Sequence, residues 1–151
     1  MAMNCEIKRL SMADVSAIKE LFVGVFANEP WNDDWSDEAQ LMRYLEDIAG
    51  NNNSLSLGLY AEGALCGIAL GSIIHWYTGT EYYIREFCVR RDSQGSGLGS
   101  LFMGKIEDFL KSDGIFSIIL STDVDTPAHG FYLKNGFGEL PKARFFHKGL
   151  K

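Results

Sequence analysis

The 151-residue sequence has few cysteines and prolines and no long apolar run, and each shortage excludes a class of protein. Its three cysteines show no CxxC spacing, so they fit neither a disulfide framework nor a zinc ribbon. Three prolines mark no linker, and we expect a single domain over residues 1–151. No segment approaches the ~18 apolar residues of a membrane span, and the N-terminus lacks the apolar part of a signal peptide. We therefore expect a cytoplasmic protein with no membrane partner.

Positive charge is also scarce. Fourteen Lys and Arg residues stand against twenty Asp and Glu residues, which gives a net charge of −6. This balance argues against a nucleic-acid partner and favours a small cationic ligand. The three histidines, His75, His129 and His147, are far apart without ligand spacing, so we predict no metal site. The hydrophobic share of 46% is that of an ordinary globular protein.

The hydrophobic pattern predicts helices alternating with strands. Helices are expected at 12–26, from an N-cap at Ser36 to about residue 49, after a glycine-rich turn at 94–99, and from an N-cap at Thr126 to Lys134. Strands are expected at 5–10, 54–61, 64–75, 81–90, 116–120 (buried on both faces) and, as a pair, within about 137–149. This order is typical of an α/β protein whose mixed central sheet carries helices on both faces.

The glycine-rich turn is the most informative segment. Gly95, Gly97 and Gly99 follow a strand and open a helix, and Arg90 and Arg91 lie just upstream. Small residues let backbone N–H groups approach an anion, and a helix N-terminus adds partial positive charge, so a diphosphate would fit. The Rossmann pattern fails at Ser100, and a near match to the Walker A motif fails at Ile106. A tight turn without a ligand is the alternative.

Two motifs resemble those of the GNAT superfamily of N-acetyltransferases. Residues 94–99 (QGSGLG) match its Q/R-x-x-G-x-G/A signature, and residues 125–137 (DTPAHGFYLKNGF) resemble its second motif. The resemblance implies the GNAT fold, in which the middle strands splay apart. It also implies direct transfer of an acetyl group from acetyl-CoA to a primary amine in a ternary complex. The segments EPWNDDW and DTPAHGFY are similar to aminoglycoside 6'-N-acetyltransferase-like members.

The resemblance also implies which residues hold acetyl-CoA. Backbone groups of one strand would pair with the pantetheine arm, amides of the glycine turn would hold the diphosphate, and a small residue would let CoA pass the last helix. These residues are Phe87, Cys88 and Val89, then Gln94, Gly95, Ser96, Gly97, Leu98, Gly99 and Ser100, and finally Asp125, Ala128 and Tyr132. Asp125 stands where many relatives have Asn, which weakens the case for a side-chain contact there.

Two residues are candidates for proton transfer. Tyr132 matches the position that often protonates the departing CoA thiolate, although it could instead be a packed aromatic beside Phe131. Glu86 lies in the middle of a predicted strand, where it could accept the amine proton directly or through water, or attract a cationic acceptor. A solvated strand face is the alternative. Relatives usually carry a bulge in this strand, so parity does not decide whether Arg85 or Glu86 faces inward.

The resemblance implies that the acceptor site lies beside the loop between the first two helices and the loop between the third and fourth strands. Trp31, Asp33, Asp34 and Trp35 could bind an ammonium group through cation–π and ionic attraction, with Trp76 from a second loop and Glu86. The alternative is that the indoles anchor the loop and the carboxylates are solvated or cap a helix.

Three functions follow from these residues. The first is acetylation of a small cationic amine such as an aminoglycoside-like sugar, a polyamine or a related metabolite. The second is acetylation of a protein N-terminus or lysine, and the third is acyl-CoA binding without catalysis. Many relatives dimerise, so a homodimer is one assembly that the resemblance allows.

Overall fold

The computed structural model describes residues 4–151 and divides them into two compact units. The first unit ends at Ser121 and the second is Thr122–Lys151. The single domain expected from the sequence stays a prediction. Within the described residues, no helix has the length and apolar character needed to cross a membrane.

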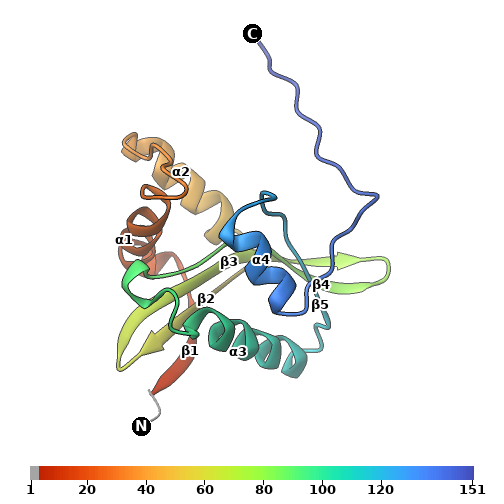
Figure 1. The fold of residues 1–151 in the computed structure, drawn as a ribbon, viewed down its shortest axis with the longest axis horizontal. Coiled ribbons are helices and arrows are strands. Elements are labelled where there is room, and N and C mark those ends of the chain that lie inside the picture. Colours follow the sequence, from red (N-terminus) through yellow and green to blue (C-terminus); the bar gives the residue numbers. More distant parts are fainter. Residues whose placement is uncertain (1–3) are drawn as a thin grey trace. The chain divides into compact units, whose positions relative to one another are not determined.

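The first unit is built on a five-stranded sheet whose spatial order β1-β2-β3-β4-β5 follows the chain (Figure 1). Its strands are β1 (Cys5–Leu10), β2 (Ser54–Ala61), β3 (Ala64–Trp76), β4 (Gly79–Val89) and β5 (Ser117–Ile119). The first three pairings are antiparallel, and β5 lies parallel to β4. The predicted mixed sheet is therefore confirmed. Glu62 and Gly63 both have positive φ, at 51° and 81°, as a tight two-residue hairpin turn requires.

The two middle strands separate part of the way along. β5 pairs with β4 only from Glu81 to Tyr83, and the rest of β4, from Ile84 to Val89, continues past the last paired residue. The expected splay of the middle strands is present. β5 itself ends after three residues.

Helices cover both faces of this sheet (Figure 1). A 3-10 turn, η1 (Met12–Asp14), leads into α1 (Val15–Phe26), which lies with α2 (Glu38–Ala49) on one face, and α3 (Leu98–Ser112) lies on the other. The α1/α2 face buries a core of Leu10, Ile18, Leu21, Phe22, Val25, Phe26, Leu41, Leu45, Ile48, Ile68, Leu70 and Cys88. On the opposite face, Phe102 of α3 stacks on Phe87 of β4 with ring centroids 5.3 Å apart.

Two local predictions in this unit are wrong. The N-cap of α2 is Asp37, whose Oδ1 accepts from the backbone N–H of Gln40. Ser36 lies one residue earlier, in a turn where its backbone N–H donates to Oδ1 of Asp34. The apolar run 116–120 is not buried on both faces. Its strand is shorter, and the Phe116 side chain is 79% exposed.

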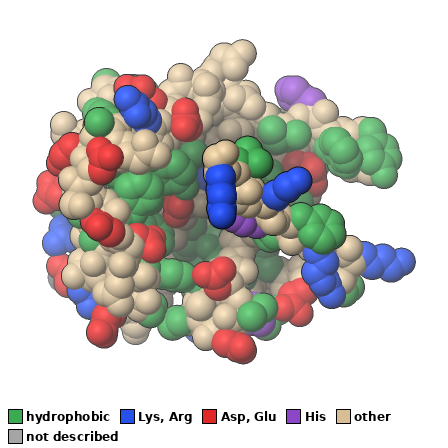
Figure 2. All heavy atoms as spheres, turned by 90° about the horizontal axis from the view of Figure 1, so that it is seen from above, with side chains coloured by type: hydrophobic (Ala, Val, Ile, Leu, Met, Phe, Trp, Pro, Cys, Tyr) green, Lys and Arg blue, Asp and Glu red, His purple; other side chains and the backbone are tan. Residues whose placement is uncertain are grey.

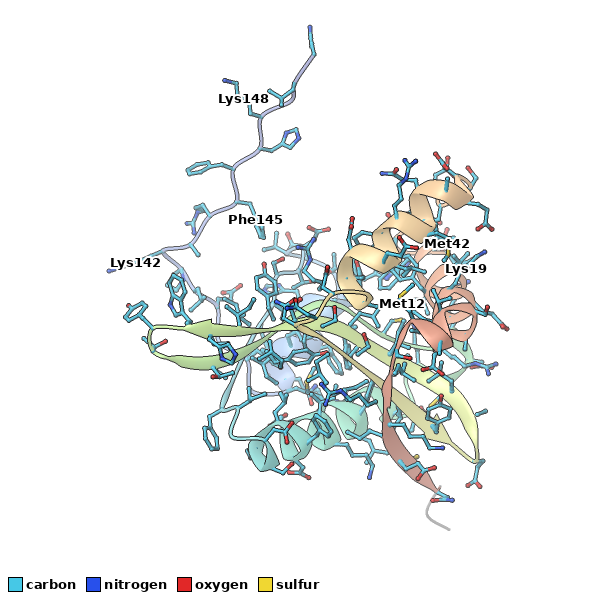
Figure 3. All side chains as sticks on the ribbon, turned by 180° about the vertical axis from the view of Figure 1, so that it is seen from behind. Met12, Lys19, Met42, Lys142, Phe145 and Lys148 are labelled. Carbon is cyan, nitrogen blue, oxygen red and sulfur yellow. The ribbon has the colours of Figure 1, made fainter. Side chains whose placement is uncertain are left out.

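The second unit contains one helix, α4 (Pro127–Lys134), capped as expected by Thr126. No strand forms in the segment that follows, so the strand pair predicted within 137–149 is wrong. The hydrogen bonds described for this segment are local: the Arg144 side chain donates to the carbonyls of Pro141 and Ala143 at 2.7 and 2.8 Å. Lys142, Phe145 and Lys148 project from this extended segment (Figure 3).

Gly71 of β3 lies where two strands approach each other closely. A Cβ at this position would come within 2.2 Å of the Tyr83 carbonyl oxygen and 2.9 Å of the Tyr82 ring. We expect Gly71→Ala to lower the free energy of unfolding by roughly 2–4 kcal/mol, since a backbone atom cannot move aside like a side chain. Urea denaturation measures this. Gly24→Ala, at a helical position with nothing within 4 Å, is the control and should not destabilise the fold.

Candidate functional site

A β-bulge in β4 determines which side chains face α1 and α2. In the ladder with β3, Ile84 pairs with Gly71 and Glu86 pairs with Leu70, so Arg85 is an extra residue without a partner position. A bulge bends the strand and changes the direction of the side chains that follow. The bulge expected for this strand is therefore present, and it lies next to Glu86.

The side chains on either side of the bulge show the change of face. Before it, Tyr82 lies on the α3 face, because its ring would meet a Cβ built on Gly71. After it, Cys88 belongs to the α1/α2 core and Glu86 contacts α2. Regular alternation would place these three even-numbered residues of β4 on one face. The extra residue thus moves Glu86 away from α3 and toward α1 and α2.

Glu86 is a partly buried carboxyl held by a short hydrogen bond. The Tyr44 hydroxyl of α2 donates to Glu86 Oε1 at 2.7 Å. Burial raises the pKa of Glu86 above its usual value, and the negative charge of Asp33 adds to this. The Tyr44 bond and the Arg85 guanidinium act in the opposite direction but do not cancel the effect of burial. A carboxyl of this kind can exchange a proton nearer neutrality than an exposed glutamate can.

Tyr44 belongs to the Glu86 cluster and is not among the site residues predicted from the sequence. Its ring stacks on Trp35, with centroids 5.3 Å apart and an angle of 18°, and it also contacts Phe22. A signal was available, because residue 44 lies three residues after Leu41 and four before Ile48, on the inward stripe of the helix. A hydroxyl on that stripe, facing a strand with an acidic residue, could have been recognised.

The other predicted acceptor residues are spread more widely. Trp35 packs edge-on against Phe22 as well as on Tyr44, so it is joined to the Glu86 cluster. Asp33 acts on Glu86 through its charge. Trp31 instead packs on Phe26, with ring centroids 5.8 Å apart. This contact agrees with the alternative that the indole anchors the loop.

Two of the predicted acceptor residues, Asp34 and Trp76, make no described contact with Glu86. Asp34 is exposed, and its hydrogen bond from Ser36 lowers its pKa, as in a loop that leads into a helix. Trp76 is 57% exposed beside Tyr77 at the end of the β3–β4 hairpin. Asp and Glu side chains are scattered widely over the surface seen in Figure 2.

The glycine-rich turn has the geometry expected of an anion site. Gly95 and Gly97 have φ of 78° and 86°, a region that favours glycine, and nothing lies within 4 Å of a Cβ built on either. Gly97 is the N-cap of α3, and no side chain caps the helix there. The first N–H groups of a helix have no partner within it, so those of Leu98, Gly99 and Ser100 can serve a ligand. These residues fit a diphosphate.

Gln94 joins this turn to the end of β4. Its Nε2 donates to the Val89 carbonyl oxygen at 3.1 Å. The Arg90 N–H donates to Cys66 on β3, and because backbone groups alternate along a strand, those of Val89 point away from β3. The glycine-rich turn therefore directly follows the free side of β4, the side that β5 does not pair with beyond Tyr83. Arg90 itself pairs with Asp92 at 2.9 Å.

The predicted site residues of the second unit lie around α4. Asp125 has a φ of 61°, and the following Thr126 accepts from the His129 N–H at 3.3 Å. Ala128 lies in the first turn of the helix. The Tyr132 ring packs edge-on against Phe131 and Phe137, at 5.4 and 5.3 Å, which is compatible with a packed aromatic. Its role in proton transfer stays a prediction.

Comparisons with known proteins agree with this geometry. The sequence profile described as the acetyltransferase (GNAT) family matches residues 16–137. An aminoglycoside acetyltransferase from an uncultured soil metagenomic sample, solved with sisomicin, superposes with a TM-score of 0.73 at 21% identity over 97% of each chain.

Two further solved structures have the same fold. An aminoglycoside 6'-N-acetyltransferase from Acinetobacter haemolyticus gives a TM-score of 0.70 at 21% identity, covering 97% of this chain and 99% of its own. An integron cassette protein from the mobile metagenome of V. cholerae gives 0.77 at 16% identity, covering 98% and 94%. No curated protein matches the sequence significantly. At these identities the likeness is one of fold.

Proposed function

Because the chain belongs to the GNAT family of acetyltransferases, we propose that it transfers an acetyl group from acetyl-CoA to the primary amine of a small cationic acceptor. The observation that carries the acceptor class is the partly buried Glu86 carboxyl, which is turned toward α2 by the bulge, accepts from Tyr44 beside the stacked Trp35 ring, and is under the influence of the Asp33 charge. A carboxylate beside an aromatic ring attracts an ammonium group. Aminoglycoside-like sugars, polyamines and related metabolites all present such groups.

The donor side of the proposal rests on β4 and the glycine turn. When bound, acetyl-CoA supplies the acetyl group as an activated thioester. Its diphosphate would be held by the backbone amides from Gln94 to Ser100, at an uncapped helix N-terminus. Its pantetheine arm would lie along the backbone of Phe87, Cys88 and Val89, beyond the point where β5 ends its pairing with β4.

We assign three roles in the reaction to residues of this chain: a base, a hydrogen-bond donor to the thioester oxygen, and an acid. Glu86 accepts the proton that an ammonium must lose before its nitrogen can form the new bond to the acetyl carbon. The Val89 N–H, on the side of β4 that points away from β3, stabilises the negative charge that develops on the thioester oxygen. Tyr132 donates a proton to the sulfur as the carbon–sulfur bond breaks. The ammonium proton thus goes to Glu86, and the second proton that the nitrogen loses as the amide forms balances the proton that Tyr132 gives to the sulfur.

The names of the structural neighbours favour one acceptor class. One was solved with sisomicin, and another carries the name of an aminoglycoside 6'-N-acetyltransferase. This supports aminoglycosides as the first acceptors to test.

The test is acetyl-CoA consumption, followed by free-thiol release, with aminoglycosides, polyamines, amino acids and short peptides. We expect thiol release that depends on a cationic small amine. Release that depends only on peptides would replace the proposal with acetylation of a protein N-terminus or lysine. Thermal stabilisation by acetyl-CoA with no release for any amine would favour a binding protein without catalysis.

Gly97→Ala tests the diphosphate site. At a φ of 86°, an alanine costs about 1–2 kcal/mol in backbone strain and moves the N–H groups that open α3. We expect CoA to bind at least about tenfold more weakly, measured by isothermal titration calorimetry. Gly104→Ala, inside the same helix and with nothing within 4 Å, is the matched control. Equal CoA affinity in both variants would contradict the assignment.

A further inference from the structure

The contacts around Glu86 carry an inference about a residue outside the motifs. We propose that Tyr44 is a positioning residue for Glu86: its hydroxyl holds carboxylate oxygen Oε1 and directs Oε2 to the acceptor amine. The inference rests on the proposed function for its catalytic consequence, but the hydrogen bond itself can be tested without turnover.

The first step of the argument is the hydrogen bond. Tyr44 Oη and Glu86 Oε1 are 2.7 Å apart, across a partly buried contact between α2 and β4. Burial and the nearby Glu86 raise the pKa of Tyr44 above its ordinary value, so the phenol stays a donor over the pH range of an enzyme assay. A donor that never ionises fixes one oxygen of the carboxylate. Among the hydrogen bonds of residues 4–151 described above, Oε2 takes part in none.

The second step is that the Tyr44 ring is itself held in place. Trp35 stacks on one face at an angle of 18°, and Phe22 contacts it at a centroid distance of 6.0 Å. The hydroxyl is therefore fixed by packing rather than by a flexible side chain. Removing only the hydroxyl, as in Tyr44→Phe, leaves these ring contacts intact.

The third step is the bulge. Arg85 and Glu86 are consecutive in β4, yet both act on the Tyr44 hydroxyl, the former by lowering its pKa through charge and hydrogen bonding. Consecutive residues of a regular strand point to opposite faces, so only the bulge lets both reach one group. Its insertion thus brings together three polar side chains, those of Arg85, Glu86 and Tyr44.

The charged and titratable groups around Glu86 determine the direction of the expected change. Arg85 and Tyr44 favour the ionised carboxylate, Asp33 and burial disfavour it, and Cys88 lies on the same face with its thiol pKa raised by burial. Removing the Tyr44 hydroxyl deletes a bond to the charged form. The pKa of Glu86 should therefore rise in Tyr44→Phe.

The first experiment measures Glu86 directly. In protein labelled with ¹³C at glutamate Cδ, the Glu86 signal is assigned by its absence in Glu86→Gln, and its titration is followed in the unliganded chain. We expect its acid dissociation constant to be about tenfold smaller in Tyr44→Phe. The control is Tyr60→Phe, which removes a hydroxyl from β2 and should leave the constant unchanged. An unchanged constant in Tyr44→Phe would overturn the proposal.

The second experiment measures the catalytic consequence. With sisomicin and spermidine as acceptor probes, we expect the rise of kcat/KM with pH to move to higher pH in Tyr44→Phe, so that the loss is about tenfold on the rising limb and disappears above it. A loss that is equal at every pH indicates a structural role only and overturns the positioning role. In Glu86→Gln protein, adding Tyr44→Phe should change kcat/KM little, since the two act as a unit.

The two proposals fail in different ways. If neither probe, nor any amine of the panel, supports thiol release by the wild-type protein, the proposed function fails. The NMR titration then still decides whether Tyr44 holds the Glu86 carboxylate. If the wild-type protein acetylates an amine but the titration of Glu86 does not depend on Tyr44, only the positioning role fails.

Discussion

Glu86→Gln is expected to lower kcat/KM for the amine acceptor by about 10²- to 10⁴-fold near neutral pH, the usual contribution of a general base. Glutamine has the same shape and can still accept the hydrogen bond that Tyr44 donates, but it cannot take up a proton. Steady-state thiol release over a range of pH measures the effect. In the wild-type protein we expect activity to rise with pH as Glu86 ionises, and this limb should be absent in the variant.

The same variant should be at least as stable as the wild-type protein at neutral pH. The pKa of Glu86 is raised in the folded state, so the folded chain binds the proton more tightly than the unfolded chain does. Its contribution to stability is then fully present below the unfolded pKa and is lost as pH rises through the folded pKa. Glutamine cannot ionise, so Glu86→Gln avoids that loss. Chemical denaturation at several pH values tests this.

A matched control separates this role from a general effect of charge. Glu81 lies in the same strand and accepts a hydrogen bond from Ser117, away from Tyr44. Glu81→Gln should leave kcat/KM within about twofold of the wild-type value, since it removes one surface charge of modest effect. If both variants lose activity equally, or if Glu86→Gln stays active, Glu86 is not the base.

Tyr132→Phe should lower kcat by about 10²-fold or more while leaving the affinity for CoA unchanged. The phenylalanine ring keeps the edge-on contacts with Phe131 and Phe137, so α4 should fold as before. Without the hydroxyl, the sulfur of the leaving group must take its proton from water. Thiol release measures kcat, and calorimetric titration measures CoA binding.

Tyr60→Phe is the control here as well, because Tyr60 is on β2 and its ring contacts Lys8 at the surface. Unchanged turnover in Tyr132→Phe would support the alternative that Tyr132 is only a packed aromatic. A loss of CoA affinity with unchanged kcat would instead assign it to cofactor binding.

Much of the fold could be predicted because its signals are local. Positive φ values at Gly95 and Gly97 follow from glycine's freedom, and the Glu62–Gly63 turn joins two apolar strands at the expected place. Where two adjacent residues carry the same local signal, the prediction is wrong by one position. Asp37 rather than Ser36 caps α2, because the side chain of Asp34 already engages Ser36.

The site was harder to predict, for a physical reason. The bulge at Arg85 adds one residue to a period of two, and no composition or spacing in the strand marks where it falls. Tyr44 contacts Glu86 across 42 positions of sequence, so only the folded chain brings them together. The strand pair predicted within 137–149 does not form in the structure, since a strand also needs a partner for its backbone groups.

In the sheet, each strand lies next to the strand that precedes or follows it in the chain. This order has a consequence for how the protein folds. β2, β3 and β4 are joined by two tight turns, so their contacts close short loops and cost little chain entropy. β1 and β5 are separated from these strands by the longer segments that carry α1, α2 and α3, so their pairing closes longer loops and costs more chain entropy. Folding should therefore nucleate in the two hairpins, and the edge strands should dock late. The bulge lies within this early-forming part, so Glu86 is directed to its face before the helix that carries Tyr44 is in place.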